Sequence, residues 1–492
     1  MNRSEKLDYA IKYIRCNKNK IVKEKRQTFH LMSQIGWCND PNGFCYHNGK
    51  IHLFYQHNPF DTSWQPMYWG HAVSDDFIKW KYLPVALAPD KFYDDNLGCF
   101  SGSAISEDDK MYLFYTGVDK NNNQQQCVAE SSDGVNFYKI KDNPVITSDS
   151  VKGIIDSKDF RDPFVFVYQN MYYCLTGVKH EKKANIALFS SKNKKNWNFV
   201  GFLFDEKKDS IICNDGVLEC PSYAKIDGSE VLFFSPSVSM YSGDKYKNSQ
   251  TVVYMIGKLD FTLGRFQYTN FNEVDYGTDF YASLLTIVPG GRVIMTAWQQ
   301  LWGRTMPTSK YGWAGSMILP RELSVKDGKL YQSPVRELNS YLKNYVMIDS
   351  ITVNDNFVSP PSLSSDVFKL CFKIKNISSQ KTGIRLMCGK SNYTLLLIDY
   401  ASGSIIFDRT NSGEVIEDKT CDPNIRKINY IGEELSFCII ADKTSLEIFI
   451  DNGKYTISSN VYPPEGCKDI QFFSEKGKSE ISFIEKWDIV CE

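Results

Sequence analysis

The 492-residue sequence lacks any run of about 18 consecutive apolar residues, the length that a membrane-spanning helix requires. It also lacks an excess of either charge, because 57 Lys and Arg balance 58 Asp and Glu for a formal net charge of −1. Binding to nucleic acid or to an anionic membrane would need a basic stripe. We therefore expect neither nucleic acid nor a membrane as a partner.

The sequence is also poor in the features of secreted and metal-binding proteins. Charged residues interrupt the segment 1–7, so no secretory leader is expected. Only six His are present, and the 14 Cys form no C-x-x-C pair and no Cys/His cluster at zinc spacing. We expect reduced thiols, no structural metal and a cytoplasmic location.

Aromatic residues are abundant, at 14% of the chain, and they favour strands and sugar-stacking surfaces over helical bundles. Helical spacing is limited to the N-terminus, where Leu7, Ala10, Ile11 and Ile14 lie on one face. We expect residues 1–27 to form a short helical extension that packs on the surface of a domain.

A repeat of about 60 residues begins near residue 36. Each unit has a short polar signature, then a turn and an aromatic-rich strand. The signatures are Asn39-Asp40-Pro41, Ser101-Gly102, Arg161-Asp162-Pro163, Glu219-Cys220-Pro221 and Tyr281-Ala282. Five such units predict a five-bladed β-propeller over residues 28–340, with the first strand of each blade facing a central funnel. The segment 312–315 is expected to supply a later strand of the fifth blade, and the segment 120–126 an exposed loop.

Beyond a Ser/Pro-rich stretch at 358–362 the pattern changes to alternating strands. We expect residues 350–492 to form a β-sandwich. The whole chain is thus predicted to be all-β apart from the N-terminal helix. Strands are expected at 367–375, 393–399, 404–408, 435–442, 445–451 and 454–458.

Three of the five signatures contain a carboxylate, at Asp40, Asp162 and Glu219. Because the inner strands of a propeller converge, these side chains are expected to meet in one pocket. Converging carboxylates repel each other, so one should hold a proton near neutral pH. A carboxylic acid that faces a carboxylate is the arrangement that glycoside hydrolysis uses.

Each carboxylate alone also has a structural interpretation. Asp40 precedes Pro41 and could form a turn, Arg161 and Asp162 could form an ion pair, and Glu219 could lie on a blade edge. Their recurrence in phase, each beside a hydrophobic strand, favours a shared site.

The motifs resemble those of a known family. The segment Gly36-Trp37-Cys38-Asn39-Asp40-Pro41-Asn42-Gly43 closely resembles the Trp-Met-Asn-Asp-Pro-Asn-Gly signature of glycoside hydrolase family 32, which contains invertases, sucrose-6-phosphate hydrolases, inulinases and levanases. Further motifs follow in the family's order at Phe100-Ser101-Gly102-Ser103, Phe160-Arg161-Asp162-Pro163, Leu218-Glu219-Cys220-Pro221, Asp279-Phe280-Tyr281-Ala282 and Gly312-Trp313-Ala314-Gly315. The resemblance covers about residues 28–335 and implies a five-bladed propeller followed by a β-sandwich.

The resemblance implies a β-fructofuranosidase that releases fructose from sucrose, sucrose 6-phosphate or short fructo-oligosaccharides without a cofactor. In that reading Asp40 is the nucleophile, Glu219 the general acid/base and Asp162 a transition-state stabiliser that Arg161 helps to keep charged. Glu219 would hold the proton that the leaving group needs. The mechanism would retain the anomeric configuration, with the two catalytic carboxyls roughly 5–5.5 Å apart.

Other pocket residues carry over from the resemblance. Asn39, Gln56 and Ser101 are expected to contact sugar hydroxyls, and Trp64 and Phe100 to form apolar walls. Trp298 and Trp302 precede Pro307, where relatives shape the leaving-group subsite, and Trp302 is taken as a site residue. Trp69, Trp80 and Trp313 are expected in the core.

The sequence departs from the family signature at Cys38, where Met is usual, so an accessible Cys38 should make the protein sensitive to thiol reagents. Arg304 and Lys310 are basic residues that could meet a substrate phosphate. A fructosyltransferase with the same nucleophile, or a sugar-binding propeller without catalysis, are the alternatives. The C-terminal sandwich could bind polysaccharide, support the propeller or form a homodimer contact.

Overall fold

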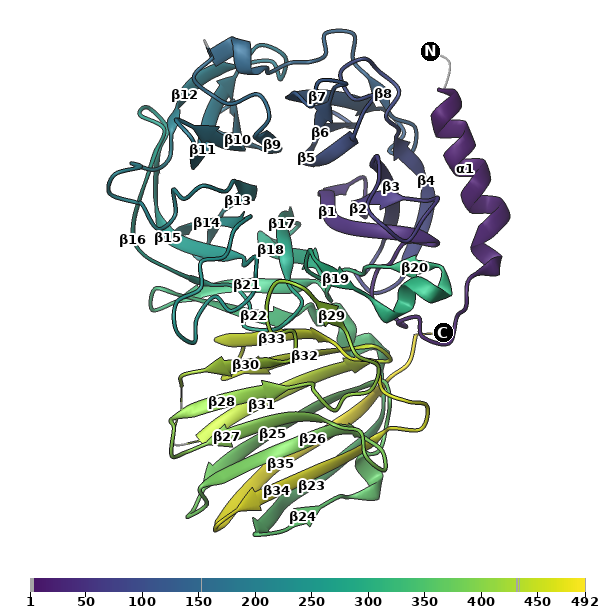
Figure 1. Ribbon diagram of the computed structural model, residues 1–492, viewed down its shortest axis with the longest axis vertical. Helices are drawn as coiled ribbons and strands as arrows, with labels where there is room; N and C mark the ends of the chain where they lie inside the picture. Colours follow the sequence, from purple (N-terminus) through teal and green to yellow (C-terminus); the bar gives the residue numbers. More distant parts are fainter. Residues whose placement is uncertain (1–3, 152, 431, 433, 492) are drawn as a thin grey trace.

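The computed structural model describes residues 4–151, 153–430, 432 and 434–491, and it confirms the predicted fold class. A ring of β-sheets lies beside a two-layered β-sandwich, and the one α-helix among the described residues lies at the outer edge of the ring (Figure 1). In the described part of the chain, no helix is long and apolar enough to cross a membrane.

The ring is a propeller of five sheets, which we call blades 1 to 5 in chain order, and the strands that form each blade pair antiparallel. Blades 1 to 4 each consist of four strands that are consecutive in the chain. In blade 5, two very short strands, β19 (Arg304–Thr305) and β20 (Trp313–Ala314), lie between the second and third strands in the sequence but do not belong to the blade. The blades are β1 (Gly36–His47), β2 (Lys50–Asn58), β3 (Tyr68–Ser74) and β4 (Trp80–Leu87); β5 (Gly98–Glu107), β6 (Lys110–Val118), β7 (Gln124–Ser131) and β8 (Tyr138–Lys139); β9 (Phe160–Tyr168), β10 (Met171–His180), β11 (Lys183–Ser191) and β12 (Asn198–Phe202); β13 (Leu218–Ile226), β14 (Ser229–Pro236), β15 (Val253–Asp260) and β16 (Arg265–Glu273); β17 (Tyr281–Val288), β18 (Arg292–Trp298), β21 (Arg321–Lys326) and β22 (Lys329–Pro334).

The first strand of each blade lines the centre of the ring. Each of these inner strands contacts the inner strands of the two neighbouring blades, and β17 of the last blade contacts β1 of the first. Since each inner strand begins at a polar signature, the five signatures lie around one central opening.

The repeat suggested that the segment 312–315 supplies a later strand of blade 5, but the structure shows that it does not. Instead β20 (Trp313–Ala314) pairs in parallel with β1, with Gly36 opposite Trp313 and Trp37 opposite Ala314. The place expected for it is taken by β21, which pairs with β18. The chain thus returns from blade 5 to blade 1 before it completes the last blade, and this contact closes the ring.

A β-bulge interrupts the pairing of every inner strand at its signature. Asp162, Cys220 and Ala282 have positive φ angles of 64°, 48° and 52°. A bulge adds a residue to one strand and turns the following side chains relative to the sheet. In this ring the five bulges turn polar side chains toward the central opening.

The sandwich packs two six-stranded sheets face to face, in the orders β23-β35-β25-β31-β32-β33 and β24-β34-β26-β27-β28-β30. Its core contains the inward-facing residues of each strand, which are every second residue, such as Phe368, Leu370 and Phe372 of β25. The strands are β23 (Leu342–Asn354), β24 (Phe357–Val358), β25 (Phe368–Asn376), β26 (Lys381–Cys388), β27 (Thr394–Asp399), β28 (Ser404–Asp408), β30 (Ile425–Ile428), β31 (Glu434–Asp442), β32 (Ser445–Ile450), β33 (Tyr455–Asn460), β34 (Asp469–Glu475) and β35 (Lys478–Ile489).

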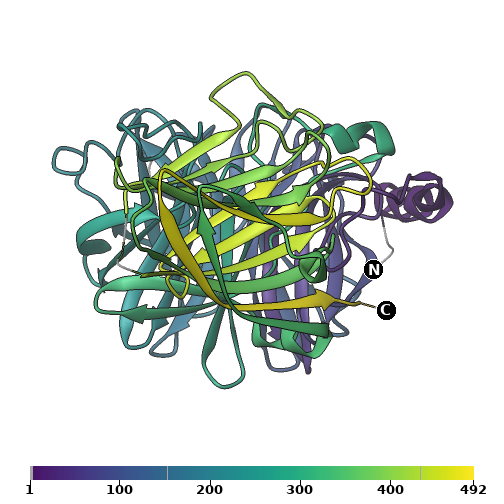
Figure 2. The same ribbon diagram turned by 90° about the horizontal axis from the view of Figure 1, so that it is seen from below.

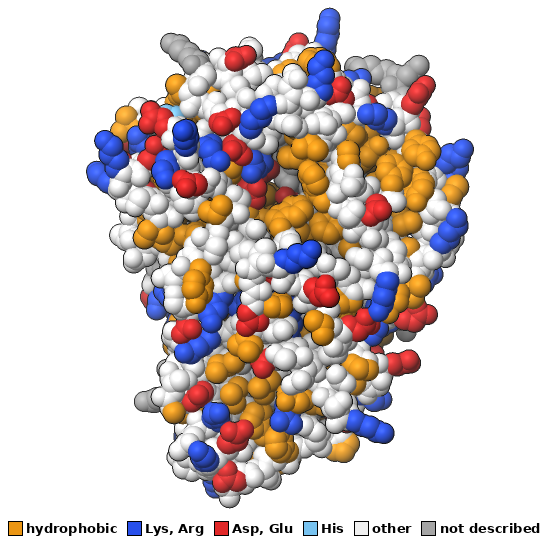
Figure 3. Space-filling view, in the orientation of Figure 1, with side chains coloured by type: hydrophobic (Ala, Val, Ile, Leu, Met, Phe, Trp, Pro, Cys, Tyr) orange, Lys and Arg blue, Asp and Glu red, His pale blue; other side chains and the backbone are white. Residues whose placement is uncertain are grey.

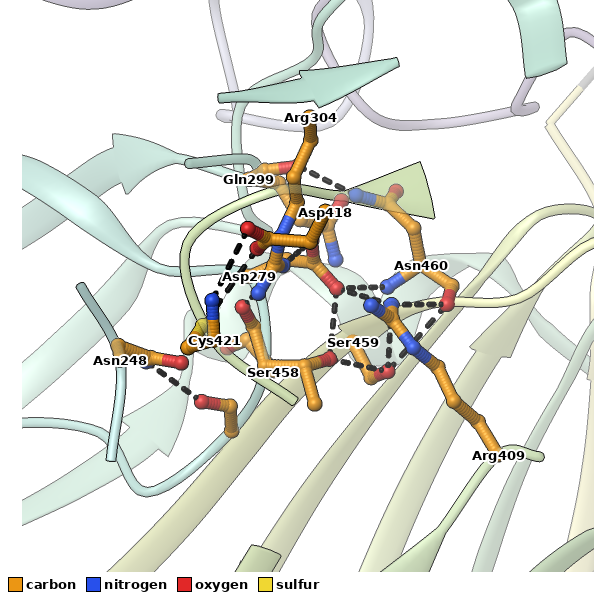
Figure 4. Close-up of polar contacts among 12 residues, drawn as sticks. Asn248, Asp279, Gln299, Arg304, Arg409, Asp418, Cys421, Ser458, Ser459 and Asn460 are labelled. Atoms are coloured by element: carbon orange, nitrogen blue, oxygen red, sulfur yellow. Dashed lines mark hydrogen bonds and ion pairs between the residues drawn. The ribbon is translucent and has the colours of Figure 1, made fainter. Parts of the chain in front are cut away.

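Two buried charge networks join the sandwich to the propeller. In the first, Arg304 of β19 (Arg304–Thr305) and Arg409 both bind the carboxylate of Asp279, and Arg304 Nε donates to Asp418 of β29 (Glu417–Asp418) at 2.8 Å (Figure 4). In this view the two arginines approach Asp279 from different sides, one from the propeller and one from the sandwich. All four side chains are buried, so each charge depends on its partners.

The second network includes a residue upstream of the first blade. Arg321 donates to Asp275 at 2.9 Å and to Glu447 at 2.7 Å, and His30 lies between Glu447 and Asp442 at 3.0 and 2.9 Å. Burial opposes the positive charge of His30, but the two carboxylates outweigh it and raise the pKa of His30 to about 9. His30 therefore bridges β31 and β32 as a cation at neutral pH.

The N-terminal helix α1 (Glu5–Asn17) lies against blade 1 and at the outer edge of the molecule when it is seen from below (Figure 2). Ser4 caps its first turn by accepting a hydrogen bond from Leu7 N. Leu7 and Ala10 are buried against Tyr68, Val85 and Ala88 of the blade. Five short 3₁₀ helices occupy connections at Lys18–Lys20, Ser148–Val151, Pro307–Tyr311, Arg336–Tyr341 and Pro361–Leu363.

Candidate active site

A pocket of about 420 Å³ opens at the centre of the propeller. The space-filling view shows a hollow there, with acidic side chains inside it and hydrophobic side chains along one rim (Figure 3). All ten site residues predicted from the sequence lie in the lining: Asn39, Asp40, Gln56, Trp64, Phe100, Ser101, Arg161, Asp162, Glu219 and Trp302. Gln124 and Asp159 complete it.

Asp40 lies at the bulge of β1 and is held by two side chains. Ser101 Oγ, from the inner strand of blade 2, donates to Asp40 Oδ2 at 2.6 Å. Asn39 Nδ2 donates to Oδ1 at 3.0 Å, and Asn39 in turn accepts from Trp37 Nε1 at 2.7 Å. Ser101 and Asn39 therefore fix the carboxylate of Asp40 in addition to lining the pocket.

Asp162 lies at the bulge of β9 and is only 5% exposed. Its Oδ2 accepts a hydrogen bond from the backbone N of Cys220 at 3.0 Å, while its own backbone N donates to Thr116 Oγ1 at 3.0 Å. The thiol of Cys220 lies 3.7 Å from both Asp40 Oδ2 and Asp162 Oδ2. One side chain thus separates the two carboxylates.

Glu219 lies at the bulge of β13 and is bound on both oxygens. Arg161 donates to Oε1 from Nε at 3.1 Å and from Nη2 at 2.9 Å. Tyr281 Oη, from the inner strand of blade 5, donates to Oε2 at 2.5 Å. These contacts orient the carboxyl of Glu219 from two neighbouring blades.

The sequence suggested that Arg161 and Asp162 could form an ion pair, but in the structure Arg161 does not bind Asp162 directly. Its guanidinium contacts Glu219, Asp159 Oδ1 at 3.0 Å and Gln124 Oε1 at 3.2 Å. Both side chains line the pocket, but they have different partners, because Arg161 binds Glu219 whereas Asp162 Oδ2 accepts from Cys220 N. The influence of Arg161 on Asp162 is therefore electrostatic.

Burial dominates the acid–base properties of the pocket. It raises the pKa of Asp40 to about 6, although the hydrogen bonds from Ser101 and Asn39 oppose the shift and the charge of Glu219 adds to it. Burial and the charge of Glu219 raise the pKa of Asp162 to about 7 against the opposing charge of Arg161. Asp40 and Asp162 therefore bind protons closer to neutral pH than exposed carboxyls do.

The rim of the pocket is aromatic. Trp64 lies edge-on to Phe100 and to Trp302, with ring centroids 5.9 and 6.4 Å apart. Trp302 is supported from behind by Trp298, 4.9 Å away, which is fully buried and does not line the pocket. Gln56 Nε2 donates to the carbonyl of Cys99 at 2.9 Å, which fixes the amide at the pocket surface.

The two basic residues considered for a substrate phosphate lie outside the pocket lining. Arg304 is buried in the interdomain network described above, and Lys310 pairs with Glu414 on the surface. Their partners are far away in the sequence, so the sequence could not indicate that both charges are already compensated.

Cys38 is 1% exposed, and burial raises the pKa of its thiol to about 12. The condition for its reaction with thiol reagents, accessibility, is therefore not met. The thiol that does lie beside the carboxylates is Cys220, whose pKa is also raised well above its ordinary value by burial and by Asp162 and Asp40.

Sequence reasoning missed three residues of the site. Gln124 and Asp159 line the pocket as partners of Arg161, and the hydroxyl of Tyr281 binds Glu219. Gln124 was placed in an exposed loop, but it begins β7, and the Gln-rich run before the apolar Cys127-Val128-Ala129 was the available signal. Tyr281 was recognised only as the marker of the fifth blade. Within the described residues, no group of three or more His, Cys, Asp and Glu is arranged to hold a metal ion.

Comparison with known proteins gives a consistent result. Residues 30–334 match the "Glycosyl hydrolases family 32 N-terminal domain" and residues 337–488 the "Glycosyl hydrolases family 32 C terminal". The sucrose-6-phosphate hydrolase of Zymomonas mobilis subsp. mobilis is 34% identical over 493 residues, covering 94% of this chain and 91% of that protein. The sucrose-6-phosphate hydrolase of Escherichia coli is 32% identical, covering 94% of each chain.

Among solved structures, the GH32 beta-fructofuranosidase of Bombyx mori superposes with a TM-score of 0.82 at 28% identity, covering 98% of this chain and 97% of that one. A mutant of the same enzyme has been solved in complex with sucrose.

Proposed function

Since the chain belongs to glycosyl hydrolase family 32, we propose that it hydrolyses terminal β-D-fructofuranosides of sucrose, sucrose 6-phosphate or short fructo-oligosaccharides with retention of configuration. The relatives named as sucrose-6-phosphate hydrolases and the sucrose complex of the Bombyx mori enzyme support this substrate class. The chain is accordingly a glycoside hydrolase that acts on a small sugar.

The observation that carries the proposal is the convergence of Asp40, Asp162 and Glu219 from three blades on one pocket. We assign Asp40 as nucleophile because Ser101 and Asn39 hold its carboxylate in place. We assign Glu219 as acid/base because Arg161 and Tyr281 orient it from the other side of the pocket. Asp162, which is buried, is the third member of the cluster and would bind fructose hydroxyls.

In the first step, Glu219 gives its proton to the glycosidic oxygen as Asp40 attacks C2 of the fructose ring. The bond between C2 and the glycosidic oxygen breaks, the leaving sugar departs with the proton, and a fructosyl-enzyme remains. Hydrogen bonds from fructose hydroxyls to Asp162 strengthen as positive charge grows on the ring. In the second step, Glu219 takes a proton from water, which attacks C2 and releases Asp40.

Product analysis tests the proposal. Wild-type protein is incubated with sucrose, sucrose 6-phosphate, short fructo-oligosaccharides and inulin, in parallel with Glu219→Ala. We expect fructose from wild type and a loss of at least about 100-fold in kcat for the variant, the usual size of an acid/base contribution. NMR of the first product should show the β-anomer.

An inverted product, or equal activity in Glu219→Ala, would refute the mechanism. Transfer products in excess of free fructose would identify a fructosyltransferase, and no turnover of any of the four sugars would favour a binding protein.

We further propose that the protein works in the cytoplasm. All 14 cysteines are free, including many that are buried. Free thiols in this number suit a reducing compartment. Fractionation of the native host, with the activity as marker, tests the assignment.

A further inference from the structure

Segment 59–67 connects β2 to β3 and places Trp64 in the pocket wall, yet four of its nine residues are solvent-exposed. Asp61, Ser63, Gln65 and Pro66 are exposed. Local hydrogen bonds shape its first turn, where Asn58 Oδ1 accepts from Phe60 N at 3.1 Å and Asn58 Nδ2 donates to the carbonyl of Ser63 at 2.9 Å. Exposed segments with few packed side chains open easily, so the position of Trp64 depends on what anchors the segment.

Met67 anchors the end of the segment, because it is fully buried and its backbone bonds to Leu97 and Cys99. The anchor near the start is an aromatic cluster around Phe60, four residues before Trp64. Tyr9 stacks on Phe60 with ring centroids 5.5 Å apart, and Tyr13 meets it edge-on at 5.0 Å. Tyr68, the first residue of β3, meets it from the blade at 5.7 Å. Two of the three rings that hold Phe60 therefore come from helix α1.

Helix α1 is itself fixed to blade 1. Leu7 and Ala10 are buried against the blade, and Lys6 Nζ donates to the carbonyl of Pro89 at 2.6 Å. The helix precedes residue 30, where the match to the family's N-terminal domain begins. It thus adds a support to the pocket that lies outside the matched catalytic domain.

We propose that α1 is a positioning element of the active site. Through Tyr9 and Tyr13 it holds Phe60, and thereby keeps Trp64 against Phe100 and Trp302, so that the aromatic rim is formed before substrate arrives. Preorganisation of this kind improves binding because the ordering cost is not incurred on association. The residues act through Trp64 and contact no substrate, so their effect belongs in KM. The kinetic part of this inference rests on the proposed function.

A double-mutant cycle tests the coupling. We expect Tyr13→Ala to raise KM for sucrose by about three- to ten-fold with kcat within about two-fold of wild type. Trp64→Ala should raise KM by itself, and Tyr13→Ala should add less than about 1.5-fold in the Trp64→Ala background, because the coupled residues form one unit. Tyr13→Phe keeps the ring and should restore the wild-type KM. Arg15→Ala, on the exposed face of the same helix, is the control.

Multiplicative effects of Tyr13→Ala and Trp64→Ala, or an unchanged KM in Tyr13→Ala, would overturn the inference. A fall in kcat together with a lower melting temperature would assign α1 a merely structural role and would overturn it as well.

Hydrogen exchange tests, without any substrate, whether α1 holds the segment that carries Trp64. Amides of residues 60–65 should exchange about ten-fold faster in Tyr13→Ala than in wild type, while those of β2 and β3 stay unchanged. Equal exchange would overturn the inference. If wild type hydrolyses none of the fructosides, the proposed function fails, and this comparison still decides whether α1 holds the segment.

Discussion

At the scale of single residues, the three carboxyls of the pocket differ in the groups that donate hydrogen bonds to them. Asp40 is bound by neutral donors, Glu219 by a cation and a phenol, and Asp162 by a backbone amide. Three carboxyls in one pocket are therefore held by three different kinds of hydrogen-bond donor. The acid limb of the pH profile and the orientation of Glu219 are the properties to measure.

Activity should fall as the pH drops through about 6. A nucleophilic Asp40 must be ionised, and its pKa is raised to about 6 chiefly by burial. Ser101→Ala removes a hydrogen bond that lowers this pKa, so the acid limb of kcat/KM should move upward by roughly half to one pH unit. A profile of kcat/KM on sucrose from pH 4 to 9 measures both. A limb near pH 4, or a downward shift in Ser101→Ala, would contradict the assignment.

Removal of one hydroxyl should disturb the acid/base. Tyr281→Phe deletes the donor to Glu219 Oε2, and we expect kcat to fall by about ten-fold or more because the carboxyl is no longer held for proton transfer. Tyr82→Phe, which loses a hydroxyl bond to the carbonyl of Met32 and does not line the pocket, is the matched control. Equal kcat in the two variants would show that Tyr281 does not position Glu219.

At the scale of elements, the five bulges connect strand geometry to chemistry. Without them the alternating pattern of a strand would point successive side chains to opposite faces. With them, neighbouring residues such as Arg161 and Asp162 both reach the pocket, and Glu219 lines it while the amide of Cys220 binds Asp162. The irregular part of each inner strand is the functional part.

Gly102→Ala tests this dependence. A Cβ at Gly102 would lie 1.9 Å from the carbonyl oxygen of Phe114, so the bulge of β5 must shift and move Ser101 away from Asp40. We expect a loss of roughly 2 kcal/mol in the free energy of unfolding and a marked loss of kcat. Gly49→Ala, at an open hairpin turn with positive φ, should cost about 1 kcal/mol and leave kcat unchanged. Urea unfolding and kcat of both variants decide the comparison.

The same scale shows what the sequence could reveal. Blade number was predictable because five polar signatures, including those of Asp40, Asp162 and Glu219, recur about every 60 residues in phase with apolar strands. The bulges were not, since they depend on the register between partner strands and leave no periodic mark. For the same reason the spacing of residues in the sequence could not predict three features. These are the binding of Arg161 to Glu219, the burial of Cys38 and the hydrogen bond from the hydroxyl of Tyr281. The strand misplaced in blade 5, β20, has only two residues, too few for a pattern.

At the scale of the whole molecule, the sandwich and the propeller are joined by charges that are far apart in sequence. His30 lies upstream of the first blade, whereas Asp442 and Glu447 belong to the sandwich. Breaking a buried charge pair from one side is costly because the other charge is left uncompensated. The two domains should therefore unfold together.

Stability should decrease at alkaline pH through His30. Its folded pKa, about 9, exceeds its ordinary value of 6.5, so its contribution is fully present below pH 6.5 and is lost as the pH rises through 9. The shift corresponds to roughly 3 kcal/mol. Urea unfolding at pH 6 and pH 9.5 should show a larger decrease for wild type than for His30→Gln, which cannot titrate. Equal decreases would mean that His30 is neutral in the folded protein.

The closure of the ring has a consequence for biosynthesis. On a ribosome, β1 emerges long before β20, the parallel partner that joins it to the last blade. Until then the nascent chain is an open arc in which the edge of β1 that later pairs with β20 is free, and such edges invite pairing with other chains. The protein is therefore most exposed to misassembly while it is being made, and chaperones that hold unfinished chains should matter more to its yield than its final stability does.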